Sequence, residues 1–294
     1  MKRFKGTGVA IVTPFKIDSS IDFAALGRVV NHVIGGGVNY IVAMGTTGES
    51  VTLTKDEKKA IISYVVETID GRVPLMVGIG GNNTQEVING VRHSNLTGVD
   101  GILSVAPYYN KPSQRGLFQH FKAIATSSQL PLVIYNVPGR TSCNITSDTC
   151  LELAHACDNI IGVKEASGDI SQIMRIIKGK PDNFSVISGD DMMTIPIVAV
   201  GGAGVISVLA NAFPGQTSEI VNHSIKGNFK SARELQFRFL EIIELLFTDG
   251  NPSGVKAMMS LMNICQNNLR LPLVPVSRTV YTRIQKAIEE VSND

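Results

Sequence analysis

Short runs of consecutive apolar residues recur along the chain and alternate with segments of helical periodicity. Continuous runs, in contrast to alternating ones, are typical of parallel strands that are covered on both faces. The runs span residues 8–12, 40–43, 75–79, 101–105, 132–135, 160–164, 184–188 and 204–207. Strands separated by helices in this way predict a (β/α)8 TIM barrel. A doubly wound open sheet is the main competing architecture.

Polar residues mark the starts of several helices between these runs. Thr54 and Glu57 have the spacing of a capping box, and Asn83 and Asp169 begin later helices in the same way. The turn at residues 78–81 lacks the third glycine of a dinucleotide-binding fingerprint, which gives the open sheet little support. Three glycines stand where the ends of helices often need a left-handed residue, namely Gly71, Gly98 and Gly179.

The chain is longer than the barrel alone requires, since a barrel of this kind takes about 200–250 residues. The last apolar run ends at residue 207, and three helical patterns follow at 229–247, 253–269 and 279–291. We therefore expect a catalytic barrel domain over residues 1–227 and a helical appendage over residues 228–294. No Ser/Gly linker separates the two parts, so the appendage is expected to pack on the barrel.

Composition excludes several classes of function. Hydrophobic residues make up 44% of the 294 residues and charged residues 18%, so a sizeable core can form. The net charge of +2, the scattered basic residues and the absence of Trp argue against nucleic acid as a partner. The uncharged stretch 192–218 is interrupted by prolines and glycines, so we expect no membrane span. The N-terminus shows no signal peptide. The four cysteines form no C-x-x-C pair and fit buried thiols in a reducing cytoplasm.

Lys164 closes the sixth apolar run, an unusual place for a lysine. Its ammonium either extends to water past the strand end or is a desolvated amine held for chemistry. Lowering a lysine pKa from about 10.4 to about 7–8 takes roughly 4 kcal/mol, which burial at a dry strand end can supply. A neutral amine there can form a Schiff base with a carbonyl substrate.

Other candidates follow the remaining runs, because active sites of such barrels lie at the C-terminal ends of the strands. The loop that contains Thr46 and Thr47 either directs backbone N–H groups at a carboxylate or is an ordinary polar turn. Tyr135 lies one strand before Lys164, where its phenol could act as general acid and base. Arg140 offers a planar fork to a carboxylate, or else a surface ion pair.

The remaining polar groups give weaker signals. Asp190 and Asp191 could be a metal site, an acid/base pair or a structural feature, and no cluster of His or Glu residues accompanies them. The five histidines show no metal-binding spacing, and no G-x-S-x-G elbow is present. We therefore expect neither a metal nor a cofactor. Tyr108 and Tyr109 fit either packing or a proton relay.

Six motifs together resemble one enzyme family. GTTGES, PYYNKPSQ, YNVPGR, GVKEASG, SGDD and GVISV occur in the order and spacing typical of the 4-hydroxy-tetrahydrodipicolinate synthases, also called dihydrodipicolinate synthases. This resemblance covers essentially the whole chain and places it in the superfamily of class I pyruvate-dependent aldolases. It implies a lyase that condenses pyruvate with L-aspartate 4-semialdehyde through a Schiff base, in the diaminopimelate route to lysine.

The resemblance also implies roles for individual residues. Lys164 is expected to form the Schiff base, and Tyr135 to donate and accept protons. The remaining implied roles are a hydroxyl relay completed by Thr46 and by Tyr109 from a neighbouring subunit, pyruvate contacts from Thr47 and Ile206, and a grip on the semialdehyde carboxylate by Arg140.

The resemblance further implies a homotetramer, built as a dimer of dimers, with a lysine feedback site. Residues that match the pattern of that site are Ser50, Asn82, Glu86 and Tyr108. Lys55 and Lys58 stand where strongly inhibited members carry histidines, and their charge repels a lysine ligand. We therefore expect weak inhibition by lysine, or none. Two alternatives remain open: another class I pyruvate aldolase such as N-acetylneuraminate lyase, which lacks the arginine and the PYYNKPSQ loop, or a non-catalytic barrel that binds keto acids.

Overall fold

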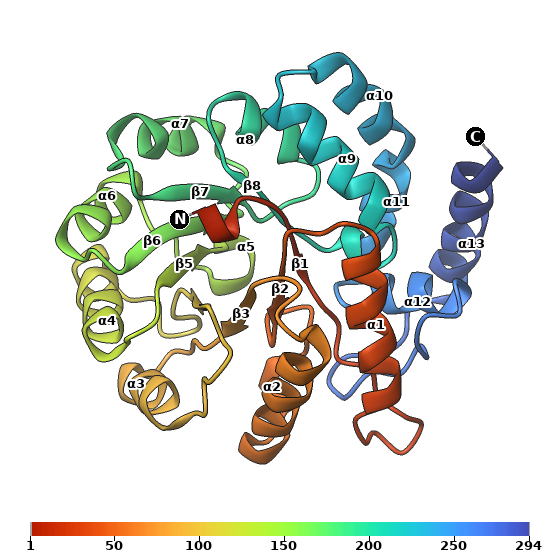
Figure 1. The fold of residues 1–294 in the computed structure, drawn as a ribbon, viewed down its shortest axis with the longest axis horizontal. Coiled ribbons are helices and arrows are strands. Elements are labelled where there is room, and N and C mark those ends of the chain that lie inside the picture. The colour runs from red at the N-terminus through yellow and green to blue at the C-terminus, as the bar shows by residue number, and fades with distance from the viewer. Residues whose placement is uncertain (1, 294) are drawn as a thin grey trace.

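A closed barrel of eight parallel strands forms the centre of the molecule (Figure 1). The structure is a computed structural model that describes residues 2–293. Each strand pairs with its neighbour in the chain, and β1 also pairs with β8. The prediction of a (β/α)8 barrel is therefore confirmed, and the alternative of an open sheet is wrong. The strands are β1 (Gly6–Ala10), β2 (Tyr40–Ala43), β3 (Leu75–Gly78), β4 (Gly101–Val105), β5 (Leu132–Asn136), β6 (Ile160–Glu165), β7 (Ser185–Ser188) and β8 (Gly204–Ser207).

Helices surround the barrel and bury its outer face (Figure 1). They are α1 (Phe23–Gly35), α2 (Lys55–Ile69), α3 (Thr84–His93), α4 (Gln114–Ser127), α5 (Pro138–Thr141), α6 (Ser147–Ala156), α7 (Ile170–Gly179), α8 (Thr194–Ala199) and α9 (Pro214–Ile225), with 3-10 turns η1 (Lys2–Phe4), η2 (Ser50–Thr52) and η3 (Leu209–Asn211). The predicted capping box of Thr54 and Glu57 is present, and Asn83 and Asp169 cap α3 and α7.

The predicted role of Gly179 as a left-handed helix end is wrong. α7 includes Gly179, and the residue that follows it is extended. A Cβ atom at Gly179 would lie 2.7 Å from Cδ1 of Leu151 on α6. The glycine therefore permits a close approach of two helices. Gly71 does adopt a positive φ after α2, whereas Gly98, also at positive φ, lies in a turn beyond the end of α3.

Apolar side chains fill the barrel interior. Phe4 packs edge-on against Tyr40 with ring centroids 5.4 Å apart, and both belong to an interior cluster that also includes Met76, Leu103 and Ile187. The interior is therefore a packed core, and a ligand has to bind at one end of it.

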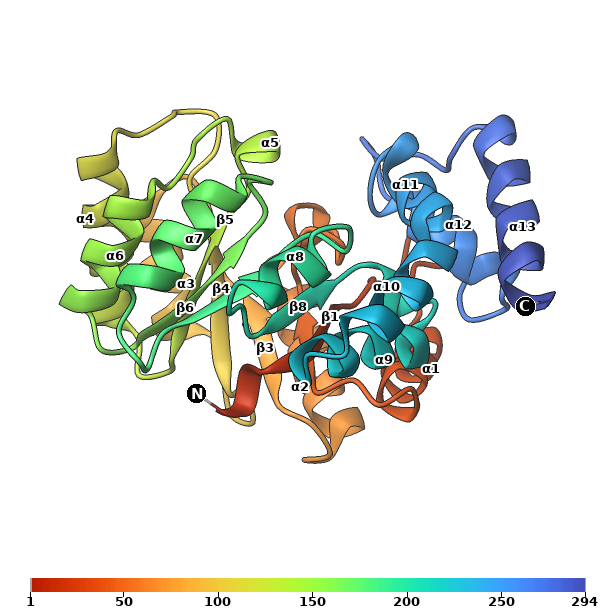
Figure 2. The ribbon, with the colours of Figure 1, turned by 90° about the horizontal axis from the view of Figure 1, so that it is seen from above.

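Four further helices follow the barrel, namely α10 (Phe229–Arg238), α11 (Leu240–Thr248), α12 (Ser253–Leu261) and α13 (Arg278–Asn293). Figure 2 shows them grouped on one side, with α13 outermost. The predicted boundary at residue 227 falls between α9 and α10. The single helix predicted over 229–247 is wrong, because it is interrupted at Phe239, whose buried ring packs against Phe213. The helix predicted to reach residue 269 ends at Leu261.

The four cysteines are buried free thiols, as predicted. The uncharged stretch 192–218 contains α8, β8, η3 and the start of α9. Within residues 2–293, every helix is too short or too polar to cross a lipid bilayer.

Candidate active site

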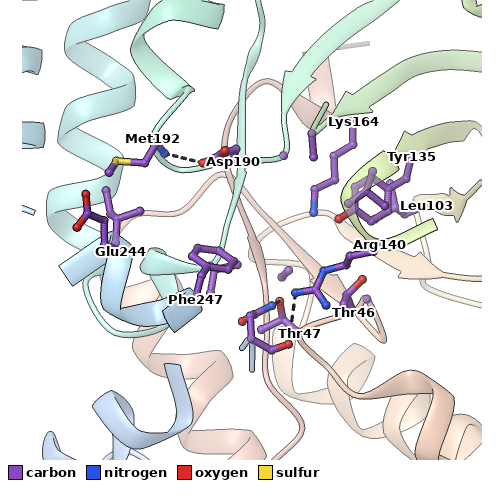
Figure 3. Close-up of a pocket in the computed structure, with 18 residues that line it drawn as sticks. Thr46, Thr47, Leu103, Tyr135, Arg140, Lys164, Asp190, Met192, Glu244 and Phe247 are labelled. Carbon is purple, nitrogen blue, oxygen red and sulfur yellow. Dashed lines mark hydrogen bonds between the residues drawn. The ribbon is translucent and has the colours of Figure 1, made fainter. Parts of the chain in front are cut away.

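A cavity of about 280 Å³ opens at the C-terminal ends of the strands, where the sequence places the candidate residues (Figure 3). Its wall comes from the strand ends and also from α11, which lies at the same end of the barrel as α5 (Figure 2). The residues that line it include Thr46, Thr47, Tyr135, Arg140, Lys164, Ala166, Gly189, Asp190 and Asn251.

Lys164 is the least expected group in this cavity. Its side chain is only 5% exposed, and its Nζ lies 4.3 Å from the ring centroid of Tyr135, its register partner on β5. Burial lowers its pKa from 10.5 to about 8, with Arg140 acting in the same direction and Asp191 opposing it. About one amine in ten is then uncharged at pH 7. Of the two interpretations of this lysine, the structure supports the desolvated amine.

Gly189, at the turn after β7, leaves room for the lysine chain. A Cβ atom at this position would lie 3.0 Å from Cε of Lys164 and 2.8 Å from Cβ of Ala166. The 2.8 Å distance is closer than Cβ atoms tolerate and the 3.0 Å distance is tight, so a larger residue would require Ala166 and the lysine chain to shift. Sequence reasoning missed this residue, because its requirement comes from a neighbouring strand.

Tyr135 presents a protonated phenol to the amine (Figure 3). Burial raises its pKa, while Arg140 and a hydrogen bond with the Thr46 side chain lower it. A phenol of raised pKa that is hydrogen-bonded to a second hydroxyl can donate a proton and take it back.

The loop after β2 is held rigidly. The Oγ1 of Thr47, a buried side chain, accepts a hydrogen bond of 3.0 Å from Nδ2 of Asn251, and the carbonyl of Gly48 accepts one of 2.7 Å from Thr13. Asn251 precedes α12, so the segment after the barrel helps to fix the loop that is the candidate carboxylate site.

Arg140 lies on α5 and lines the cavity. None of the ion pairs in the described part of the chain involves it, so the interpretation as a surface ion pair finds no support. Its Nη2 donates to the carbonyl of Asn251 at 3.4 Å, which leaves most of the guanidinium's donors for a ligand.

The two aspartates have different surroundings. Asp191 is buried and accepts hydrogen bonds from Ser207 Oγ and from the backbone N–H groups of Val208 and Leu209, so it holds the turn after β8. Asp190 lines the cavity, and its Oδ1 accepts from the N–H of Met192. Among residues 2–293 there is no group of three His, Cys, Asp or Glu side chains placed to hold a metal ion.

Two predicted site residues do not line the cavity. Tyr109 is 89% exposed and adopts a positive φ of 71° in the loop after β4. Ile206 is fully buried in the barrel interior, in the same cluster as Tyr135, while Val208 lines the cavity from the end of β8.

The residues that match a lysine feedback site lie outside the cavity lining. Asn82 precedes α3, where its carbonyl accepts a hydrogen bond of 3.0 Å from Asn110 in the loop that carries Tyr108. Lys58, on α2, is half-buried, and this burial lowers its pKa. The other matching residues are Ser50, at the start of η2, and Glu86, in the first turn of α3.

A buried ion pair that joins the loop after β2 to α12 was not predicted. Nζ of Lys256 on α12 lies 2.5 Å from Oε1 of Glu49, and both side chains are 0% exposed. Oε2 of Glu49 accepts a hydrogen bond of 3.1 Å from the backbone of Arg270. The signal in the sequence was a lysine inside the apolar run 254–259, which marks a buried charge that needs a partner.

A barrel that buries a weakly basic lysine amine beside a phenol has the arrangement of enzymes that bond covalently to carbonyl substrates. Comparison with known proteins narrows this class. The model of the dihydrodipicolinate synthetase family matches residues 3–291, and the chain belongs to that family. The predicted resemblance is therefore confirmed.

Individual relatives agree over nearly the full length. The 4-hydroxy-tetrahydrodipicolinate synthase of Parabacteroides distasonis is 50% identical to this chain, and the alignment covers 98% of this chain and 97% of that protein. A monomeric dihydrodipicolinate synthase variant is 39% identical, with a TM-score of 0.96 over 99% of this chain and 98% of its own. The chloride-inhibited dihydrodipicolinate synthase of Acinetobacter baumannii, complexed with pyruvate, is 37% identical, with a TM-score of 0.95 over 98% and 99%.

Proposed function

We propose that this protein is a 4-hydroxy-tetrahydrodipicolinate synthase, which condenses pyruvate with L-aspartate 4-semialdehyde. The observation that carries the proposal is the buried amine of Lys164, with its pKa lowered to about 8 and its Nζ 4.3 Å from the ring centroid of Tyr135. Full-length relatives of the same name support it, at identities up to 50%.

In the first stage the uncharged amine of Lys164 attacks the keto carbon of pyruvate. A carbinolamine forms, takes up a proton and loses the keto oxygen as water, which gives a protonated imine and leaves the pyruvate carboxylate unchanged. The phenol of Tyr135 transfers the protons, and its hydrogen bond with Thr46 gives it a partner for the returning proton. Thr47 and the backbone of its loop hold the pyruvate carboxylate.

In the second stage the imine loses a proton from the pyruvate methyl group and becomes an enamine. The enamine carbon attacks the aldehyde of the second substrate, whose oxygen takes up a proton. The substrate amine then displaces Lys164 in a ring closure that frees the enzyme. Arg140 holds the carboxylate of the semialdehyde at the cavity mouth, where most of its donors are free.

We further propose that Tyr109 acts in a neighbouring subunit of a homotetramer. Its ring is 89% exposed, and its positive φ stores strain that a partner subunit would explain. Two further apolar residues, Val51 and Leu271, are also exposed. Analytical ultracentrifugation should give a tetramer, and Tyr109→Phe should slow catalysis without changing that mass. A monomer with full activity would contradict the proposal.

Feedback by lysine is proposed to be weak or absent. Lys55 and Lys58, both in the first turns of α2, add positive charge beside the site that Ser50 and Glu86 would form. Titration of the enzyme with lysine should leave its rate unchanged at micromolar concentrations. Strong inhibition in that range would contradict the proposal.

The choice of second substrate distinguishes the synthase from other pyruvate aldolases. The protein should turn over pyruvate with aspartate 4-semialdehyde and show little activity with pyruvate and N-acetylmannosamine. Arg140→Ala should raise the KM for the semialdehyde by about 10- to 100-fold, because a charge-assisted pair is lost, with little change in the KM for pyruvate. The reverse substrate preference would identify a sugar-acid aldolase, and no turnover with either would favour a binding protein.

A further inference from the structure

A buried polar cluster lies on the outer face of the barrel, directly behind the reactive residues. The strand register pairs Tyr135 with Lys164, and Asn136 with Glu165. Successive residues of a strand point to opposite faces of the sheet, so the second pair faces the helices when the first faces the cavity. Glu165 is 1% exposed and Asn136 is fully buried. Within residues 2–293, no ion pair neutralises this carboxylate.

Hydrogen bonds satisfy the carboxylate instead of a countercharge. Oε1 of Glu165 accepts from the N–H of Ser167 at 2.8 Å, and Oε2 accepts from Nε2 of Gln172 on α7 at 3.1 Å. The Nδ2 of Asn136 lies 3.1 Å from both oxygens. Burying an ionised carboxylate is costly unless every oxygen is bonded, so the cluster has to keep its full set of donors.

The same cluster holds the segment that carries Arg140. Oδ1 of Asn136 accepts from the N–H of Ile145 at 2.9 Å, and its Nδ2 donates to Oδ1 of Asn144 at 2.8 Å. Nδ2 of Asn144 in turn donates to Oε1 of Gln172 at 2.9 Å. Because α5 lies between Asn136 and Asn144, both ends of the short helix that carries Arg140 are fixed.

We propose that Glu165 is a positioning residue that sets the relative placement of Lys164, Tyr135 and Arg140 by fixing the direction of this chain of amides. A carboxylate only accepts hydrogen bonds, so Asn136 and Gln172 must turn their NH2 groups toward it and their oxygens away. Those oxygens then accept from the backbone N–H of Ile145 and from Nδ2 of Asn144, which are two of the hydrogen bonds that hold the segment after α5. The inference rests on the proposed function, since it concerns the geometry of that reaction.

Replacing the carboxylate by an amide breaks this order. In Glu165→Gln one NH2 group meets another, at Asn136 or at Gln172. If the Gln172 amide rotates by 180°, its NH2 group faces the NH2 group of Asn144. If the Asn144 amide then rotates as well, its NH2 group faces the NH2 group of Asn136. No arrangement of the four side chains satisfies every donor, so the ends of β5 and β6 have to shift apart.

An exchange of the two groups restores most of this order, with Nδ2 of Asn136 donating to the one remaining oxygen at position 165. In the double variant Glu165→Gln/Gln172→Glu, the amide at 165 donates to the carboxylate at 172 and still accepts from Ser167. The carboxylate at 172 accepts from Asn144 with its second oxygen. Gln172→Glu alone would instead place two carboxylates at the 3.1 Å contact now made by Gln172 and Glu165, which is strongly unfavourable.

The test compares the wild type, the two single variants and the double variant Glu165→Gln/Gln172→Glu. For each protein it measures kcat, the KM for pyruvate and the rate at which borohydride reduces the imine of Lys164 and pyruvate to a stable adduct, here called borohydride trapping. Each single variant should lower kcat and the trapping rate by about 10-fold or more, while the KM for pyruvate changes by less than about 3-fold. The exchange should return kcat to within about 3-fold of the wild type.

Asn159→Ala is the matched control, because Asn159 lies directly before the start of β6, the strand that ends at Glu165. Its Nδ2 donates to the carbonyls of Ala125 and Ser128 just before β6 begins. The control should lower the urea midpoint and leave kcat unchanged. Wild-type kcat in Glu165→Gln, failure of the folded exchange variant to recover, or an equal loss of kcat in the control would each overturn the inference. Absence of trapping in the wild type would instead refute the proposed function.

Discussion

The reactive lysine should cost the protein stability, and Lys164→Met measures that cost. Methionine has a similar length and needs no water, so it fits the space that the aliphatic part of the lysine occupies. The pKa of Lys164 falls from 10.5 to about 8 on folding, a difference of about 2.5 units. At about 1.4 kcal/mol for each pKa unit, the folded state at pH 7 bears a cost of about 3–4 kcal/mol, and the variant should be more stable by this amount.

The pH dependence gives the same prediction a sign. Between pH 8 and pH 10.5 the folded chain binds fewer protons at Lys164 than the unfolded chain, so wild-type stability rises with pH across this window. The stabilisation by Lys164→Met should therefore be full below pH 8 and disappear as the pH approaches 10.5.

Urea unfolding at a fixed protomer concentration, followed from pH 7 to pH 10.5, measures this difference. The variant should be inactive and more stable at pH 7. A variant that is less stable than the wild type at pH 7, or whose advantage does not change with pH, would refute the reasoning.

Two further substitutions test the surroundings of the cavity. Gly189→Ala places a Cβ 3.0 Å from Cε of Lys164, so it should slow borohydride trapping and cost about 1–3 kcal/mol, whereas Gly215→Ala, which meets no atom within 4 Å, should do neither. Lys256→Met leaves the carboxylate of Glu49 buried and unpaired, and should lower the free energy of unfolding by about 3–5 kcal/mol in urea titrations, with a raised KM for pyruvate. Adding Glu49→Gln should recover part of the stability. Unchanged trapping in the first variant, or unchanged stability in the second, would contradict these assignments.

The barrel was predictable because each strand is buried on both faces and so appears as a continuous apolar run. The runs at 40–43, 101–105 and 204–207 match β2, β4 and β8 residue for residue. The break between α10 and α11 was not predictable, because apolar periodicity continues through Phe239. At the break the ring of Phe239 contacts Phe213, a tertiary contact that local sequence does not encode.

The site was predictable where a residue type contradicts its local setting. Lys164 at the end of an apolar strand is such a residue, and Lys256 in the apolar run of α12 was another that could have been found. Gly189 and Glu165 gave no local signal, since a glycine at a turn and a glutamate at a strand end are both ordinary. Their importance comes from contacts with the neighbouring strand and with α7.

Covalent capture of pyruvate tests the central claim most directly. The protein is incubated with pyruvate and borohydride over a range of pH, digested, and analysed by mass spectrometry. We expect one reduced pyruvate per chain, located on Lys164, with an initial trapping rate that rises with pH through a midpoint near the pKa of about 8. An adduct on another lysine, or none at any pH, would contradict it.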